Sequence, residues 1–179
     1  MSPLKRAGSK SSIGRDMVAL SPLDWKEYRE PFCGSASMLD FVPTNIPRWI
    51  NDKDWRVVRF LTWLRDDETA VDEIMGLTSR LTDATAAYHA FCDAKYGFYK
   101  GEPLAVLLIS RLSYLQQYSL RRSNIASLGY SYLSRLDHLL TRENVQAFRE
   151  RLQGVKITCG DYSELLNAPG DGVWIYLDP

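Results

Sequence analysis

The stretch VWIYLDP at residues 173–179 decides the fold class of this 179-residue chain. The apolar run from Val173 to Leu177 is typical of a buried strand in a parallel sheet. Asp178 follows where that run ends. Open α/β sheets bind their ligands in the crevice beyond the carboxyl ends of the strands, so this carboxylate is a candidate for the chemistry of the protein.

Three upstream segments also have strand character. They are Glu27–Phe32, Arg48–Asp52 and Val155–Cys159. We expect the first and fourth strands to be neighbours at the centre of a doubly wound sheet. Residues 53–152 instead place apolar side chains at helical spacing, over a length that exceeds a single crossover. The sequence therefore predicts an α/β domain formed by residues 1–52 and 153–179, with residues 53–152 inserted as a helical subdomain.

Turn and capping residues predict where individual helices begin and end. We expect one helix to end at Gly97, a long buried helix to cover Leu104–Leu120 after Pro103, and another to run from Thr141 to Gly154. Two short helices are expected nearer the N-terminus, over Asp16–Leu23 and from Met38 to Val42.

Charge and composition exclude several classes of protein. Lys plus Arg and Asp plus Glu number 22 each, so any DNA contact must come from local basic clusters rather than from an overall positive field. The three cysteines and two histidines show no metal-ligand spacing, so we expect reduced thiols and no metal site. No apolar segment is long enough to span a bilayer or to serve as a signal peptide, so we expect a cytoplasmic protein without membrane contact.

The segment EPFCGSAS at residues 30–37 places small residues at a turn between a strand and a helix. Small side chains let a ligand approach the backbone, and a helix N-terminus offers unpaired amides. A tight turn without a ligand explains the segment equally well. With a single glycine, it is not a dinucleotide-binding fingerprint.

Three charged residues outside that turn are further candidates. Asp52 lies about 18 positions after Gly34, close to the offset at which a carboxylate binds ribose hydroxyls, although it or Asp54 could instead cap the next helix. Asp161 follows another strand, where a turn or cap is the commoner role. The Gly8–Lys10 segment lacks the spacing of a phosphate-binding loop, but Lys10 can still hold a carboxylate as a point charge.

Basic and aromatic residues alternate near the end of the predicted long helix. The candidates for DNA contact are Arg111, Arg121, Arg122 and Asn124, interleaved with Tyr114 and Tyr118. Such mixtures suit phosphate contacts and base stacking. A solvated helix end explains them slightly better on sequence alone.

Five motifs occur in a fixed order along the chain: Lys5–Lys10, Glu30–Ser37, Asn51–Asp52, Gly160–Tyr162 and Asp178–Pro179. In this order the chain resembles, over almost its whole length, the Dam-type DNA adenine-N6 methyltransferases. The resemblance implies a class I, Rossmann-like α/β fold that binds S-adenosylmethionine and acts on double-stranded DNA, with the helical block as target-recognition subdomain. It also implies a bacterial or phage-encoded protein of the kind found in restriction-modification systems.

The resemblance further implies roles for individual residues. Asp178 and the carbonyl of Pro179 would be catalytic, accepting hydrogen bonds from the amino group of an adenine flipped out of the duplex. Asp52 would bind the ribose hydroxyls of the cofactor, Lys10 its methionine end, and Asp161 would lie near its adenine. The other implied cofactor contacts are Arg6, Gly8, Glu30, Pro31, Phe32, Gly34, Ser35 and Tyr162.

The chain departs from the family pattern at several positions. The family usually has an aromatic residue where Arg6 stands and a glycine where Ser9 stands. Ser110–Tyr114 matches the family's Asn-Arg-x-x-Phe only weakly, so the target DNA sequence does not carry over. The second proline and the tyrosine expected after Pro179 are missing. We therefore expect these residues alone to bind the cofactor without catalysis, and to need a C-terminal segment or a second chain to complete the sheet.

Two other functions stay open on the residues alone. One is a non-catalytic nucleic-acid-binding module in which the Rossmann remnant is structural. The other is a nucleotide-binding enzyme of different chemistry, against which the missing phosphate loop and glycine fingerprint count. Binding of S-adenosylmethionine or its demethylated product distinguishes a methyltransferase from the first alternative.

Overall fold

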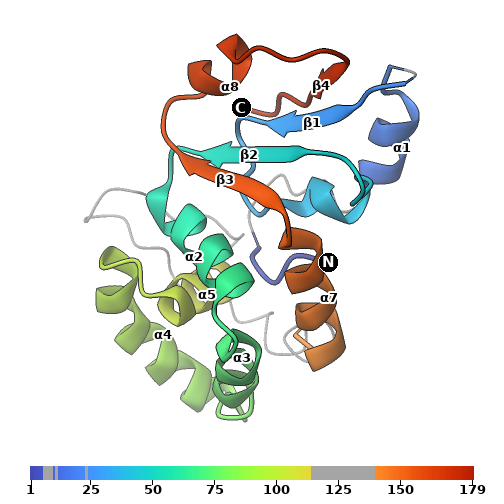
Figure 1. Ribbon diagram of the computed structural model, residues 1–179. Helices are drawn as coiled ribbons and strands as arrows, with labels where there is room; N and C mark the ends of the chain where they lie inside the picture. Colours follow the sequence, from blue (N-terminus) through green and yellow to red (C-terminus); the bar gives the residue numbers. More distant parts are fainter. Residues whose placement is uncertain (6–9, 11, 23, 114–139) are drawn as a thin grey trace.

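A parallel sheet organises the computed structural model, which describes residues 1–5, 10, 12–22, 24–113 and 140–179. The strands are β1 (Glu27–Glu30), β2 (Arg48–Asp52), β3 (Val155–Cys159) and β4 (Val173–Ile175). They are ordered β3-β2-β1-β4, all parallel (Figure 1). Tyr28 lies opposite Trp174, so the expected pairing of the first and fourth strands is confirmed. The α/β class with a parallel sheet is confirmed as well.

Strands β2 and β3 have the predicted bounds, whereas β1 and β4 are each two residues shorter. Strand β1 ends at Glu30 because Pro31 has no amide hydrogen to donate to a neighbouring strand. Beyond β4, the Tyr176 amide still donates to the Arg29 carbonyl at 2.8 Å. Trp174 and Tyr176 are buried but Leu177 is 55% exposed. The run at 173–177 is therefore buried on one face only, not on both.

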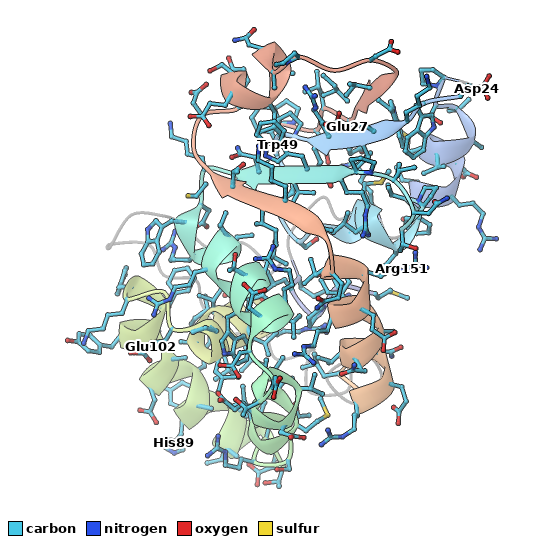
Figure 2. All side chains as sticks on the ribbon, viewed as in Figure 1. Asp24, Glu27, Trp49, His89, Glu102 and Arg151 are labelled. Atoms are coloured by element: carbon cyan, nitrogen blue, oxygen red, sulfur yellow. The ribbon has the colours of Figure 1, made fainter. Side chains whose placement is uncertain are left out.

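The buried face of the sheet packs against helices. Tyr28, Ile50 and Trp174 belong to the main core, together with side chains of α2 (Trp55–Asp66) and α7 (Arg142–Leu152). Helix α2 contacts β2, β3, α5 (Pro103–Leu112) and α7. On the opposite face, Trp49 of β2 has the Lys156 ammonium 3.3 Å from its ring centroid (Figure 2).

The helical block contains α2, α3 (Ala70–Thr78), α4 (Ala84–Tyr99), α5 and α7. Two predicted helix ends are wrong. Helix α4 continues past Gly97 to Tyr99, and the left-handed turn is at Gly101 (φ 65°) instead. Helix α5 ends at Leu112 rather than Leu120, because Ser113 is extended (φ −67°, ψ 142°). The rest of that predicted helix lies outside the described residues.

The predicted ends of α7 are confirmed. Thr141 caps its start, accepting a hydrogen bond from the Asn144 amide at 3.3 Å, and Gly154 (φ 70°) follows its end. The expected short helices occur with shifted bounds: α1 covers Gly14–Ala19, and a three-ten helix, η1, covers Ser37–Asp40. A further short helix, α8, covers Ser163–Asn167.

The strands share one direction, so their carboxyl ends meet at one edge of the sheet. Figure 1 shows α2 starting from this edge, directly after β2, and the C-terminus beside the end of β1. Within the described part of the chain, no helix combines the length and apolar character needed to cross a membrane. The division between α/β domain and inserted subdomain stays a prediction.

Candidate functional site

The carboxyl edge of the sheet gathers three acidic residues and one lysine. Glu30 ends β1, Asp52 ends β2 and Asp178 follows β4. Asp178 and Asp52 both act electrostatically on Glu30, and so does Lys10 from the N-terminal segment. The structure therefore brings together four residues that the sequence motifs singled out.

The loop after β1 turns the amides of Cys33 and Gly34 toward the end of β2. Gly34 (φ 51°) and Ala36 (φ 54°) both adopt left-handed conformations. The Cys33 amide donates to the Asn51 carbonyl at 2.8 Å, which ties the loop to β2. The Asn51 amide nitrogen in turn donates to the carbonyls of Pro31 and Gly160, both at 3.1 Å. One buried side chain thus holds the loops that follow β1 and β3.

Asp52 is oriented by two backbone amides. Its Oδ2 accepts a hydrogen bond from the Gly34 amide at 2.7 Å, and its Oδ1 accepts one from the Asp54 amide at 2.8 Å. Asp54, not Asp52, is the N-cap of α2 and accepts from the Arg56 amide. The capping alternative for Asp52 is therefore wrong. The two amides hold this half-buried carboxylate in one orientation at the carboxyl edge.

Lys10 binds Asp178 directly. Its Nζ lies 2.5 Å from Asp178 Oδ2, and its own backbone amide donates to Ser37 Oγ at 3.2 Å. The side chains of this pair are 22% and 39% exposed, so the contact is partly shielded from water. The sequence assigned Lys10 to the methionine end of a cofactor and did not anticipate that it holds the candidate catalytic carboxylate.

Glu30 is buried beneath this ion pair. Tyr28 Oη donates to Glu30 Oε2 at 2.9 Å within the core. Burial raises the pKa of Glu30 to about 8, the Tyr28 hydrogen bond opposes this rise, and the charges of Asp178 and Asp52 add to it. Tyr28 was missed by motif-based reasoning. The two-residue period of a strand, which places positions 28 and 30 on one face, is the signal that could have found it.

Aromatic rings flank the same edge. Phe32 and Tyr162 lie with ring centroids 5.2 Å apart, and Tyr162 is 46% exposed. Asp161 Oδ1 accepts from the Ser163 amide at 2.9 Å, and hydrogen bonds from the Ser163 hydroxyl and amide lower the pKa of this exposed carboxylate. Asp161 therefore has the turn-capping role that is the commoner one for a carboxylate after a strand. Its place near a cofactor stays a prediction.

The DNA candidates fall mainly on residues that the structure does not describe. The DNA candidates Arg121, Arg122 and Asn124 lie outside the described residues, and so do the cofactor candidates Arg6 and Gly8. Arg111 is described and is only 4% exposed. Its Nε donates to the Pro3 carbonyl at 2.6 Å, and burial lowers its pKa to about 10. Because it anchors the N-terminal segment to α5, we no longer assign Arg111 to DNA.

Two comparisons with known proteins bear on this site. A family model described as D12 class N6 adenine-specific DNA methyltransferase matches residues 7–179. A search of curated proteins found no match. Across the described residues, no cluster of three or more His, Cys, Asp or Glu side chains could hold a metal ion.

Proposed function

The chain belongs to the D12 class of N6 adenine-specific DNA methyltransferases, and we propose that the carboxyl edge of its sheet holds both S-adenosylmethionine and the target adenine. The activity of this class is transfer of a methyl group to N6 of adenine in DNA, and its fold is Rossmann-like. The observation that carries the proposal is the convergence of Glu30, Asp52 and Asp178 with Lys10 at one edge.

The charge of this edge fits the cofactor. S-adenosylmethionine supplies an electrophilic methyl group on a positively charged sulfonium. Among the described residues, three carboxyl groups and one lysine meet here. With Glu30 protonated below its pKa of about 8, the set still carries one net negative charge, which favours a cationic ligand over an anionic one. Asp52 would bind the ribose hydroxyls, because two amides already fix its orientation. The rings of Phe32 and Tyr162 would line the adenine.

Asp178 would act on the substrate through hydrogen bonding. When two acceptors hold both hydrogens of the adenine amino group in a tetrahedral arrangement, the nitrogen lone pair leaves conjugation with the ring and can point at the methyl group. We assign this acceptor role to Asp178 Oδ1 and the Pro179 carbonyl. Lys10 holds Oδ2 and so fixes the direction of Oδ1, which makes Lys10 a positioning residue. Alignment of two bound reactants supplies most of the remaining rate enhancement.

Replacing Asp52 tests the cofactor site. We expect Asp52→Ala to weaken S-adenosylmethionine binding by about 1.5–3 kcal/mol, the range for a lost hydrogen bond to a charged group. Isothermal titration calorimetry measures the change. Asp171→Ala is the control, since that carboxylate is almost fully exposed beside β4. If the variant is folded, as judged by thermal unfolding, and binds with the same affinity as the wild type, Asp52 is not part of the cofactor site.

A contiguous cluster of cations and aromatic rings adjoins the same edge. Trp55 starts α2 three positions after Asp52 and is 45% exposed, and Gly101 packs against its ring. Arg59 Nη1 donates to the Lys100 carbonyl at 2.9 Å, and the Lys100 ammonium lies 4.4 Å from the centroid of Tyr96, which is 68% exposed. Cations suit contacts with DNA phosphates, and exposed aromatic rings suit stacking with bases.

We propose that Arg59 and Lys100 contact phosphates of the bound duplex. Glu102, two positions after Lys100 and just before α5, is the acidic residue nearest to Lys100 in sequence. Because the whole chain has no net charge, DNA affinity has to come from such local clusters. Arg121, Arg122 and Asn124 stay predicted contacts of the target-recognition segment.

Salt dependence tests the phosphate contacts. We expect the double variant Arg59→Gln/Lys100→Gln to reduce the slope of log affinity against log salt by about two, one unit for each lost phosphate contact. Fluorescence anisotropy with a labelled duplex measures the slope. Lys26→Gln/Arg142→Gln is the matched control, with two exposed cations away from this cluster. A slope equal to that of the control would assign Arg59 and Lys100 to a solvated surface.

A further inference from the structure

Glu30 differs from the other two carboxyl groups at the carboxyl edge by its burial. It is 3% exposed, whereas the side chain of Asp178 is 39% exposed and that of Asp52 is half-buried. It also lies at the centre of the set, since both other carboxylates act on it electrostatically. An ionised carboxylate at such a position has lost its hydration and is repelled by two like charges.

The groups that face Glu30 come from four parts of the described chain. From its own strand comes Tyr28, and from the end of β2 comes Asp52. From the end of β4 come Tyr176 and Asp178, and from the N-terminal segment Lys10. Lys10 is the single cation of this set, and its ammonium is in contact with Asp178. The negative charge of Asp178 offsets the effect of Lys10 on Glu30, so Lys10 does not restore an ordinary carboxyl pKa, and the pKa of Glu30 is about 8.

We propose that Glu30 is the residue that distinguishes the cationic cofactor from its demethylated product, by losing its proton to solvent when S-adenosylmethionine binds. This inference rests on the proposed function, which puts the cofactor at the carboxyl edge. The two ligands differ by one positive charge, because S-adenosylhomocysteine has a neutral thioether where S-adenosylmethionine has a sulfonium. A positive charge beside Glu30 stabilises its carboxylate form, and a neutral sulfur does not.

Proton release couples affinity to pH. If binding removes one proton, the affinity for S-adenosylmethionine rises up to about tenfold per pH unit below pH 8, while the affinity for S-adenosylhomocysteine changes less. The same linkage favours product release, since Glu30 takes up a proton again once the positive charge is gone. Tyr28 supports both states, because its hydroxyl can donate to Glu30 Oε2 whether or not the acid is ionised.

Calorimetry in several buffers tests the proposal without measuring activity. The slope of binding enthalpy against buffer ionisation enthalpy gives the number of protons released. At pH 7 we expect close to one proton for S-adenosylmethionine and clearly fewer for S-adenosylhomocysteine, from the linkage of a group with a pKa near 8. The sulfonium lowers the pKa of the amino group of S-adenosylmethionine relative to that of S-adenosylhomocysteine, so the titration of each free ligand is measured separately and subtracted.

Glu30→Gln should abolish the difference between the two ligands, because an amide keeps the shape and the acceptor for Tyr28 but cannot ionise. Asp171→Asn, at an almost fully exposed carboxylate just before β4, should keep it. Equal proton release for both ligands in the wild type, or a difference that survives in Glu30→Gln, would overturn the proposal. If Glu30→Gln does not fold, the wild-type comparison decides alone. Failure of either ligand to bind would instead overturn the cofactor site, and this inference with it.

Discussion

Asp178→Ala is expected to lower the rate of methyl transfer to adenine about 100- to 1,000-fold, the range for removing one group that stabilises developing charge in a transition state. Positive charge develops on the adenine amino nitrogen as it attacks the methyl group. Without the carboxylate, that charge and the out-of-plane amino group both lose their acceptor. Transfer of labelled methyl groups to duplex DNA, measured for the gene product that carries this sequence, gives the rate.

Two variants separate the charge of Asp178 from its hydrogen bond. Asp178→Asn keeps an acceptor oxygen but loses the charge and the partner of Lys10, so we expect a rate between those of the wild type and Asp178→Ala. Asp171→Ala, at an exposed carboxylate just before β4, should leave the rate unchanged. An Asp178→Ala rate within about threefold of the wild type, with S-adenosylmethionine still bound, would mean that another group receives the amino hydrogens.

The sheet could be predicted from sequence because each strand carries its own signals. The bounds of β2 and β3 could be predicted to the residue, since Pro47 and Lys53 flank β2, and Gly154 and Gly160 flank β3. The end of α5 could not be predicted, because Leu104–Leu120 contains no glycine or proline to mark Leu112 as the last helical residue. Arg111 was misassigned for a related reason, since a helix pattern does not tell a buried arginine from an exposed one.

The residues of the candidate site could be singled out from the sequence, but the contacts between them could not. Local motifs singled out Glu30, Asp52 and Asp178, and parallel strand order brings them to one edge. The ion pair between Lys10 and Asp178 joins residues near opposite ends of the chain, so no local pattern could specify it. The hydrogen bond from the Gly34 amide to Asp52 depends on the left-handed conformation of Gly34, which the sequence permits but does not require.

The free energy of unfolding should fall as pH rises from about 5 to 8.5, and Glu30 should account for a large part of the fall. Its pKa is about 8 in the folded protein against an ordinary value of 4.5, so the folded state binds more protons across this interval. The contribution is fully present below pH 4.5 and is lost as pH rises through 8. The steepest slope for one such group is about 1.4 kcal/mol per pH unit. We expect a loss of a few kcal/mol, measured by urea denaturation at each pH.

Glu30→Gln isolates this contribution from every other titrating group. The amide cannot ionise, and its oxygen can still accept the hydrogen bond of Tyr28, so the core keeps its packing and its polar contact. The difference in unfolding free energy between the variant and the wild type should therefore grow in favour of the variant by about 2–4 kcal/mol between pH 5 and 8.5. Asp66→Asn is the control, because hydrogen bonding to Arg65 lowers the pKa of that exposed carboxylate and confines its effect to acid pH. A difference for Glu30→Gln that stays constant from pH 5 to 8.5 would show that Glu30 is already ionised in the folded protein, with its charge balanced by Lys10.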